Sequence, residues 1–401
     1  MNPMRFRLCP TPEQQALLLE QCAHARYVYN LGNEQRLMWR PGRGPAPGYL
    51  AQCRQLTEAR ADNPWLAAGS QTVQQQALRD LDQAWRRFFD GTSRRPGWRK
   101  VGQHEGLRIV GTQALRVRHD NHRWSSVFVP KIGWVRFRRT RGMPPWKSYR
   151  VTLDRAGRWH IAFAVIPDPI PGPGTGEVVG VDRGVTVACA LSTGEMTSPA
   201  GLRPNEAERL LRLQRRLARA QRGSNRRATL RGQIARLRAR EVDRRKDWVE
   251  KTSTDLARRF DVIRVEDLRI GQMTRSAKGT VANPGRNVRA KAGLNRGVLA
   301  SGWGLLVTRL EQKAPGRVER VPAAYTSQRC HACGHTDPGN RESQAVFRCR
   351  ACGHTDNADI NGAKNIACST AAGLAVAGRG DRAKSARSMK RQPQPAALLR
   401  V

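Results

Sequence analysis

The chain has 401 residues, of which 39% are hydrophobic, so it is long enough for about two to four domains with buried cores. It carries 72 Lys and Arg against 32 Asp and Glu, a formal net charge of +40. Such a charge predicts a nucleic-acid partner, although the Arg codons of a GC-rich genome would produce a similar excess. There is no apolar run of about 18 residues and no apolar leader, so we expect no membrane span and a cytoplasmic, prokaryotic protein that acts at the nucleoid.

The first 170 residues combine helical and strand patterns. Residues 4–10 predict a short strand, and residues 11–100 hold two amphipathic helical patterns around a Pro- and Gly-rich loop at 40–48. Residues 107–166 alternate with period two between turn residues, which predicts a sheet or small β-barrel.

One face of the second helical pattern is polar. Gln71, Gln75 and Arg79 follow one another at i, i+4 and i+8. Gln and Arg can bind the edges of adenine and guanine, so this face is a candidate for reading DNA; an ordinary solvated helix face would have the same pattern.

A Pro- and Gly-rich linker at 167–176 predicts a domain boundary, and an apolar strand follows in which Asp182 lies between Gly180 and Gly184. Burying an Asp is costly unless it binds a metal or is paired. Residues 204–260 predict a basic helical hairpin, with 16 Lys and Arg against 6 Asp and Glu in positions 201–250. A second apolar strand then ends at Glu266.

Two Cys-x-x-Cys pairs, each followed by Gly-His, are separated by fifteen residues. This spacing predicts a zinc ribbon with four thiolate ligands, the alternative being two disulfides. The ligands would be Cys330, Cys333, Cys349 and Cys352. The other five cysteines are scattered, which fits a reducing compartment.

A third acidic position, Asp359, opens a helical segment directly after the second cysteine pair. If Asp182, Glu266 and Asp359 converge, their like charges require cations, and an all-oxygen site without His favours Mg²⁺ or Mn²⁺. Two such ions would support phosphodiester hydrolysis. Each acid also has a simpler explanation: Asp182 could cap a turn, Glu266 could pair with an Arg, and Asp359 could cap its helix.

Several segments occur in the order of a known family: GVDRG at 180–184, VEDL at 265–268, LNRG at 294–297, YTSQRCHACGH at 325–335 and CRACGHTDNADINGAKNI at 349–366. Together they resemble TnpB, the OrfB-type transposon-encoded relative of the type V CRISPR effectors. The resemblance implies a RuvC-like nuclease that uses a guide RNA to cut double-stranded target DNA beside a short motif, with Asp182, Glu266 and Asp359 as its acids. The family's usual Asn-Ala-Ala is Asn361-Gly362-Ala363 here.

The expected fold is therefore α+β and multidomain. It has an RNase H-fold nuclease with an inserted zinc ribbon, and a β-barrel wedge domain with an inserted helical recognition domain. The expected boundaries are 1–10 and 101–170 for the wedge, 11–100 for recognition, 171–325 for the nuclease, 326–356 for the ribbon, 357–368 for the last nuclease segment and 369–401 for a disordered basic tail.

Two other functions are compatible with these residues. One is an RNA-guided DNA-binding regulator with little cleavage, which would normally have lost one of the acids. The other is a DNA transposase or resolvase that needs no RNA. The sequence is compatible with a protein that serves a transposon and with one that serves a CRISPR array. It is also compatible with either a monomer or a homodimer.

Overall fold

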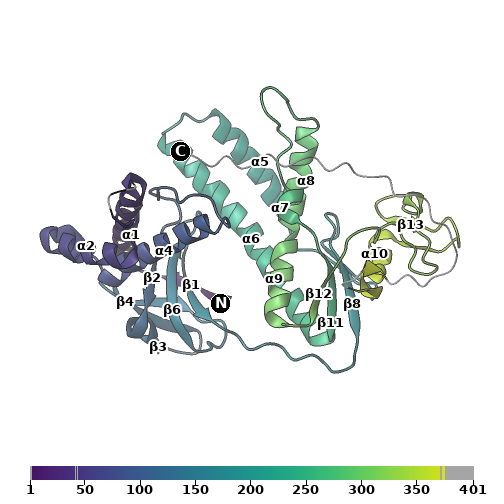
Figure 1. Ribbon diagram of the computed structural model, residues 1–401, viewed down its shortest axis with the longest axis horizontal. Helices are drawn as coiled ribbons and strands as arrows, with labels where there is room; N and C mark the ends of the chain where they lie inside the picture. The colour runs from purple at the N-terminus through teal and green to yellow at the C-terminus, as the bar shows by residue number, and fades with distance from the viewer. Residues whose placement is uncertain (1, 41, 43, 371–372, 375–401) are drawn as a thin grey trace.

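The computed structural model describes residues 2–40, 42, 44–370 and 373–374, arranged as two α/β lobes joined by an extended linker (Figure 1). The basic tail expected at 369–401 lies outside the described residues, apart from two short paired strands, β15 (Ser369–Thr370) and β16 (Gly373–Leu374). Within the described ranges, no helix is both long and apolar enough to cross a membrane.

The first lobe is built on a seven-stranded antiparallel sheet of order β2-β6-β7-β1-β5-β4-β3. Its edge strands β2 and β3 are linked by the short helix η1 (Gly111–Leu115). The strands are β1 (Asn2–Cys9), β2 (Gly106–Val110), β3 (Val117–His119), β4 (Trp124–Val129), β5 (Gly133–Arg138), β6 (Trp146–Leu153) and β7 (Trp159–Val165). The period-two pattern at 107–166 is confirmed as strands; between β6 and β7 the chain turns at 154–157, where Gly157 supplies a positive φ of 77°.

The helical segment expected between β1 and β2 is confirmed. It consists of α1 (Pro12–Met38), α2 (Tyr49–Asp62), α3 (Pro64–Ala68) and α4 (Gln71–Phe89). The predicted apolar stripe of α4 packs with α1 against one face of the sheet, so helices and sheet share a single core. Val73, Ala77 and Leu81 of α4 meet Phe6 and Phe137 of the sheet in this core.

The second lobe contains a five-stranded sheet of order β10-β9-β8-β11-β12. β8 (Val178–Asp182), β11 (Val262–Glu266) and β12 (Val318–Val321) are parallel, whereas β9 (Cys189–Leu191) and β10 (Met196–Thr197) continue the sheet antiparallel. β8 and β11 are apolar because both faces of the sheet are covered. Figure 1 shows α9 (Trp303–Lys313) on one side and α10 (Ala358–Cys368) on the other.

The predicted helical hairpin is confirmed as α5 (Pro204–Arg219) and α6 (Asn225–Arg259). Leu210, Leu213, Leu230 and Leu237 hold the two helices together, and the C-terminal part of α6 packs with α9 on the sheet. Two short helices, α7 (Ile270–Met273) and α8 (Val288–Ser301), precede α9. An ion pair joins the lobes: Nη1 of Arg158, in the turn after β6, lies 2.6 Å from Oδ2 of Asp243 in α6.

Candidate active site and cysteine cluster

Asp182 and Glu266 are the last residues of adjacent parallel strands, β8 and β11. Val181 lies opposite Val265 in the register of this pair, so the next residue of each strand leaves the sheet at the same level. Carboxyl ends of parallel strands are where α/β proteins commonly place ligand sites, because the loops diverge there. The two acids are half-buried.

Asp359 enters the same place from α10, which packs on β8. The expectation that Asp359 could cap this helix is wrong. The N-cap is Asn357, whose side chain accepts hydrogen bonds from the N–H groups of Asp359 and Ile360 at 2.9 and 3.3 Å. Asp359 therefore lies in the first turn, where the helix dipole favours its negative charge and its carboxylate is free for other partners.

Two glycines allow α10 to lie unusually close to β8. A Cβ on Gly180 would overlap the carbonyl oxygen of Ala363, and a Cβ on Gly362 would lie 3.2 Å from Oδ2 of Asp182. Gly180 thus makes room for the backbone of the helix rather than for a ligand. Gly362, the departure from the family pattern, faces the Asp182 carboxylate directly.

Burial and like charges act together on the acids. Burial, followed by the charges of Glu266 and Asp359, raises the pKa of Asp182 from its usual 3.8 to about 7. Burial also raises the pKa of Glu266, against the effect of a hydrogen bond from Thr326. When it is ionised, a carboxylate in such surroundings is stabilised by a nearby cation.

The acids do not form a tight cluster. Among the described residues, two groups bring all their ligand atoms within 4.8 Å of one another, and both lie in the cysteine-rich segment; the three acids do not form such a group.

Three further residues of this site were not predicted as site residues from the sequence. Arg183 is buried beside Asp182, and its guanidinium donates a hydrogen bond to the backbone carbonyl of Glu266. The Thr326 hydroxyl donates to Oε1 of Glu266 at 2.7 Å. Nη2 of Arg341 donates to Oδ1 of Asp359 at 3.0 Å. Sequence spacing gives no signal for these contacts, because each partner is 18 or more residues away.

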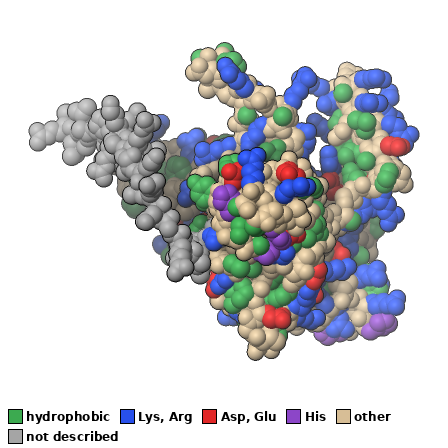
Figure 2. Space-filling view, turned by 90° about the vertical axis from the view of Figure 1, so that its right-hand side faces the viewer, with side chains coloured by type: hydrophobic (Ala, Val, Ile, Leu, Met, Phe, Trp, Pro, Cys, Tyr) green, Lys and Arg blue, Asp and Glu red, His purple; other side chains and the backbone are tan. Residues whose placement is uncertain are grey.

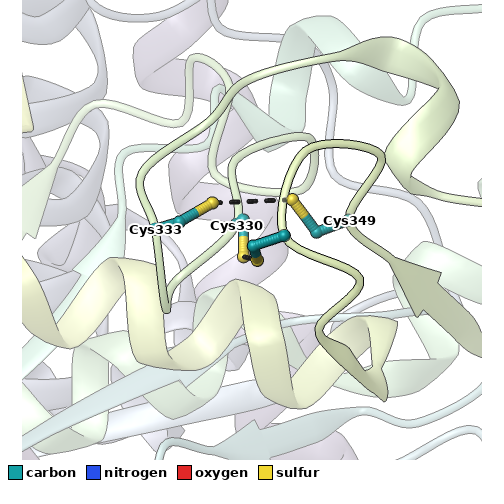
Figure 3. Close-up of side chains that lie close together, drawn as sticks. Cys330, Cys333 and Cys349 are labelled. Carbon is teal, nitrogen blue, oxygen red and sulfur yellow. Dashed lines mark hydrogen bonds between the residues drawn. The ribbon is translucent and has the colours of Figure 1, made fainter.

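The four predicted zinc ligands come together between two turns of the same form (Figure 3). These turns, the Cys-x-x-Cys-Gly-His segments at 330–335 and 349–354, are called knuckles below. The Sγ atoms of Cys330 and Cys352 are 3.8 Å apart, and those of Cys333 and Cys349 are 3.5 Å apart. The two sulfurs of a disulfide would be about 2.05 Å apart. Thiolates bound about 2.3 Å from a tetrahedral zinc have sulfur–sulfur distances close to those observed here. The geometry thus favours the metal site over the disulfide alternative.

Each knuckle closes in the same way. The N–H of Gly334 donates to the backbone carbonyl of Cys330, and the N–H of Gly353 donates to the backbone carbonyl of Cys349. Both glycines have a positive φ, 77° and 72°. A short hairpin of β13 (Val346–Arg348) and β14 (Thr355–Asn357) leads from this segment into α10.

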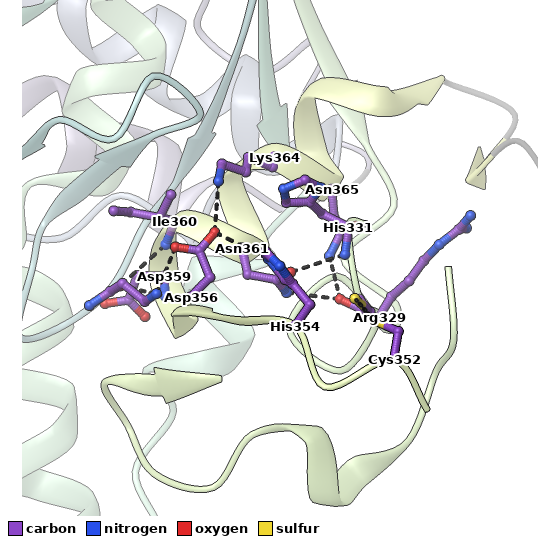
Figure 4. Close-up of polar contacts among 12 residues, drawn as sticks. Arg329, His331, Cys352, His354, Asp356, Asp359, Ile360, Asn361, Lys364 and Asn365 are labelled. Atoms are coloured by element: carbon purple, nitrogen blue, oxygen red, sulfur yellow. Dashed lines mark hydrogen bonds and ion pairs between the residues drawn. The ribbon is translucent and has the colours of Figure 1, made fainter. Parts of the chain in front are cut away.

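Two Asn side chains of α10 hold the first knuckle (Figure 4). Nδ2 of Asn361 donates to the carbonyl of Arg329 at 2.8 Å, and Nδ2 of Asn365 donates to the carbonyls of Thr326 and Arg329 at 2.9 and 2.7 Å. The motif that carries Asp359 therefore also fastens the cysteine-rich segment to the helix.

His331, His354 and Asp356 form the second compact group in this segment. Lys364 already lies 2.7 Å from Oδ2 of Asp356, and the N–H of Asn357 binds the other oxygen. Asp356 is thus neutralised by an ammonium group, and we assign no metal to this group.

The candidate DNA-reading residues lie on the outer side of α4. Gln71 and Arg79 are exposed and Gln75 is partly exposed. The guanidinium of Arg79 stacks 4.0 Å from the ring centre of Tyr49, so it is held in one orientation by a neighbouring helix. The three residues share a face, as expected, and lie in the other lobe from the acids.

Comparison with known proteins places the chain in a family. A family model described as a probable transposase, OrfB of IS605, matches residues 160–277. A curated protein of Escherichia coli K12, described as "Putative RNA-guided DNA endonuclease InsQ", is 34% identical over 98% of this chain and 97% of that protein. This chain belongs to the OrfB-type, TnpB family.

Further similarities cover the rest of the family architecture. A curated protein of Streptomyces pristinaespiralis, described as "Putative RNA-guided DNA endonuclease", is 30% identical over 98% of this chain and 96% of its own length. A model described as the Cas12f1-like TNB domain matches residues 303–366, which include all four clustered cysteines. A third model, described as a helix-turn-helix domain, matches residues 3–40, where the structure has strand β1 and the single long helix α1.

A similar fold occurs in a solved structure, the cryo-EM complex of Cas12f1 with single guide RNA and target DNA. Its protein chain aligns with 89% of this chain and 83% of its own length, with a TM-score of 0.54 and 14% identity. The arrangement of both lobes of this TnpB-family chain is thus shared with a Cas12f1 protein.

Proposed function

We propose that this chain is an RNA-guided DNA endonuclease that cuts target DNA beside a short motif, in the service of a transposon or as a miniature type V effector. The observation that carries the proposal is the placing of Asp182, Glu266 and Asp359 around one point, at two adjacent strand ends and a helix start. The similarity over nearly the full length to proteins described as RNA-guided DNA endonucleases supports the same function.

The fold of the second lobe supports a RuvC-like, RNase H-fold nuclease. β10, β9 and β8 pair antiparallel, and β11 and β12 continue the sheet parallel to β8. The first and second acids end the parallel strands β8 and β11. We assign residues 171–325 and 357–368 to this nuclease, 326–356 to the inserted zinc ribbon, 1–10 and 101–170 to the wedge and 11–100 to recognition.

The three carboxylates fit Mg²⁺ or Mn²⁺, because they are hard oxygen donors and because the pKa of Asp182, raised to about 7, marks a site that favours a bound cation. Cations bound there would activate water and stabilise the leaving oxygen. Asp182 and Glu266 would hold them from the sheet and Asp359 from the helix. Arg341 would keep the Asp359 carboxylate in one orientation.

The cysteine segment would bind a structural zinc through Cys330, Cys333, Cys349 and Cys352, since all four sulfurs are already grouped at suitable separations. The zinc would take no part in the chemistry, because four protein ligands leave no open position.

Guide RNA and target DNA would lie on the basic surfaces. Arg5 and Arg7 of β1 alternate with buried Phe6 and Leu8, and so they point away from the core of the sheet, as Arg136 and Arg138 of neighbouring β5 do. Figure 2 shows further Lys and Arg side chains around the edges of the face that carries the cysteine segment. Such surfaces bind phosphates, and Gln71, Gln75 and Arg79 are our candidates for reading the DNA motif.

The test is cleavage of a matched DNA by the chain purified with its co-expressed RNA. We expect Mg²⁺-dependent cutting that Asp182→Ala abolishes while target binding persists, and that RNase treatment prevents. Cutting by Asp182→Ala at the parental rate would refute the catalytic site. Cutting that survives RNase would refute the guide RNA, and tight target binding without cutting in Mg²⁺ or Mn²⁺ would refute the endonuclease.

A further inference from the structure

We propose that Thr326 is a positioning residue for Glu266, and that through Thr326 the zinc ribbon supports the nuclease site. This inference rests on the proposed function, since it assigns Glu266 a cation. It concerns a residue that is neither a zinc ligand nor one of the three acids.

The contact is short and buried. The Thr326 hydroxyl lies 2.7 Å from Oε1 of Glu266, and the residue is 3% exposed. The same hydroxyl lies 3.2 Å from the carbonyl of Ala323. A hydroxyl has a single proton to donate, and the shorter distance and the charged acceptor favour Glu266. No other residue that the structure describes donates a hydrogen bond to this carboxylate, so Oε2 is left for a cation.

Thr326 is held by the same elements that shape the ribbon. Its carbonyl accepts from Asn365 of α10, and Asn365 also binds the carbonyl of Arg329, one residue before the zinc ligand Cys330. Tyr325 has a φ of 64°, and its carbonyl accepts from the N–H groups of Gln328 and Arg329. Residues 325–330 thus form one tight turn, fixed at one end by the cysteine cluster and in the middle by α10.

The physical consequence follows from the geometry of carboxylate ligands. A carboxylate that binds a cation through one oxygen is oriented by the hydrogen bond to its other oxygen, and loss of such a partner typically costs about 10- to 100-fold in metal affinity or activity. Glu266 extends from a strand end, and Thr326 is the group that sets its rotation. When the turn at 325–330 loosens, as it should without zinc, Glu266 loses this orientation.

The experiment measures cation binding without relying on cleavage. The probe is Tb³⁺, a hard cation that prefers carboxylate oxygens, and its luminescence is sensitised by nearby Trp side chains. Trp303 donates from Nε1 to the carbonyl of Gly184, two residues after Asp182, which places an indole beside the site. The titration uses the full chain after digestion of its RNA, and only the signal that disappears in Asp182→Ala is counted.

The informative variants are Thr326→Val, which keeps the shape but not the hydroxyl, and Thr326→Ser, which restores the hydroxyl. We expect Thr326→Val to weaken Tb³⁺ binding about tenfold and Thr326→Ser to bind within about twofold of the parent. The matched control is Thr308→Val, because the Thr308 hydroxyl is exposed and bonds only its own helix at Gly304. Equal Tb³⁺ affinity of Thr326→Val and the parent overturns the proposal. If Thr326→Val fails to fold, Thr326→Ala takes its place with the same criterion.

The coupling to zinc has its own arm. Cys349→Ser should weaken Tb³⁺ binding in the parent but add little to Thr326→Val, because both changes act through the same contact. Additive effects overturn the coupling. If the parent has no signal that depends on Asp182, the cation site itself is wrong, which is a failure of the proposed function and is distinct from equal binding by parent and variant.

Discussion

Arg341 and Asp359 are joined across 3.0 Å by a hydrogen bond between a guanidinium of the cysteine segment and a carboxylate of α10. The same nitrogen, Nη2, donates to the carbonyl of Gln344 at 3.0 Å, and the Gln344 side chain binds Thr186 beyond β8 at 2.9 Å. The segment 341–344 therefore crosses the edge of the acidic site and is fastened on both sides of it.

Arg341→Ala should slow cleavage by about tenfold to a hundredfold, because a charge-assisted hydrogen bond contributes about 1.5–3 kcal/mol. Single-turnover cleavage rates with saturating target DNA would measure this. The control is Arg348→Ala, which removes a cation from the same segment whose ion pair with Glu342 is exposed. Faster cleavage by Arg341→Ala would mean that Arg341 obstructs the site instead of orienting Asp359.

Gly180→Ala should destabilise the second lobe by about 3 kcal/mol or more, because the added methyl group meets the backbone of α10. Cleavage should be lost as well, since Asp359 moves with the helix. The reference is Gly232→Ala at a partly exposed position of α6, where the nearest atom to a Cβ is the end of the Arg236 side chain at 3.9 Å. That change should stabilise the helix by about 0.5–1 kcal/mol. Denaturant unfolding of both variants checks the contrast, and equal stability would contradict the close packing of β8 and α10.

Asp182→Asn should stabilise the metal-free protein by about 1 kcal/mol, because a buried carboxylate beside Glu266 and Asp359 is replaced by a neutral amide. The measurement is the unfolding temperature in buffer without Mg²⁺. Added Mg²⁺ should raise the unfolding temperature of the parent and not that of the variant. A lower unfolding temperature for the variant without Mg²⁺ would show that the three acids do not repel one another.

Cys349→Ser should release the zinc and lower the unfolding temperature of the second lobe, since a structural zinc contributes directly to folding. Metal content by mass spectrometry and a thermal melt measure the two effects. Cys9→Ser, at an exposed position at the end of β1, provides the control. Unchanged zinc content in Cys349→Ser would refute the four-thiolate site.

His160 should make the first lobe less stable in mild acid. Burial, together with the charge of Arg5, lowers the pKa of His160 to about 4, below the value of about 6.5 in an unfolded chain. Between pH 6.5 and pH 4 the unfolded state therefore binds the extra proton. Stability is fully present above pH 6.5 and is lost as the pH falls through this window, by on the order of 2 kcal/mol.

The variant that checks this is His160→Gln, which should show a shallower loss of unfolding free energy over the same window. Zinc ligands also take up protons in acid, so the informative quantity is the difference between parent and variant at each pH. Parallel curves for the two proteins would exclude His160 as the cause.

Local patterns were sufficient for most elements and for the grouping of the four cysteines. The period-two pattern at 107–166 correctly predicted strands, and the apolar stripe of α4 lies in the core. The Cys-x-x-Cys spacing correctly predicted that four sulfurs meet. These predictions succeeded because each feature depends on residues that are close together in the chain. The sequence suggested Asp359 as the N-cap of α10, whereas the N-cap is Asn357, two residues earlier. Either residue type can act as a cap, and only the backbone dihedrals distinguish them.

Thus the sequence alone determined the candidate residues of this TnpB-family chain: three acids at two strand ends and a helix start, and two Cys-x-x-Cys pairs whose turns are closed by glycine. Only the tertiary structure decided what surrounds them. Gly180 and Gly362 bring α10 onto β8, Arg341 reaches Asp359, and Thr326 reaches Glu266 from 60 residues away. Such contacts depend on how separate elements pack, and a pattern of period 2 or 3.6 contains no information about the partner across the interface.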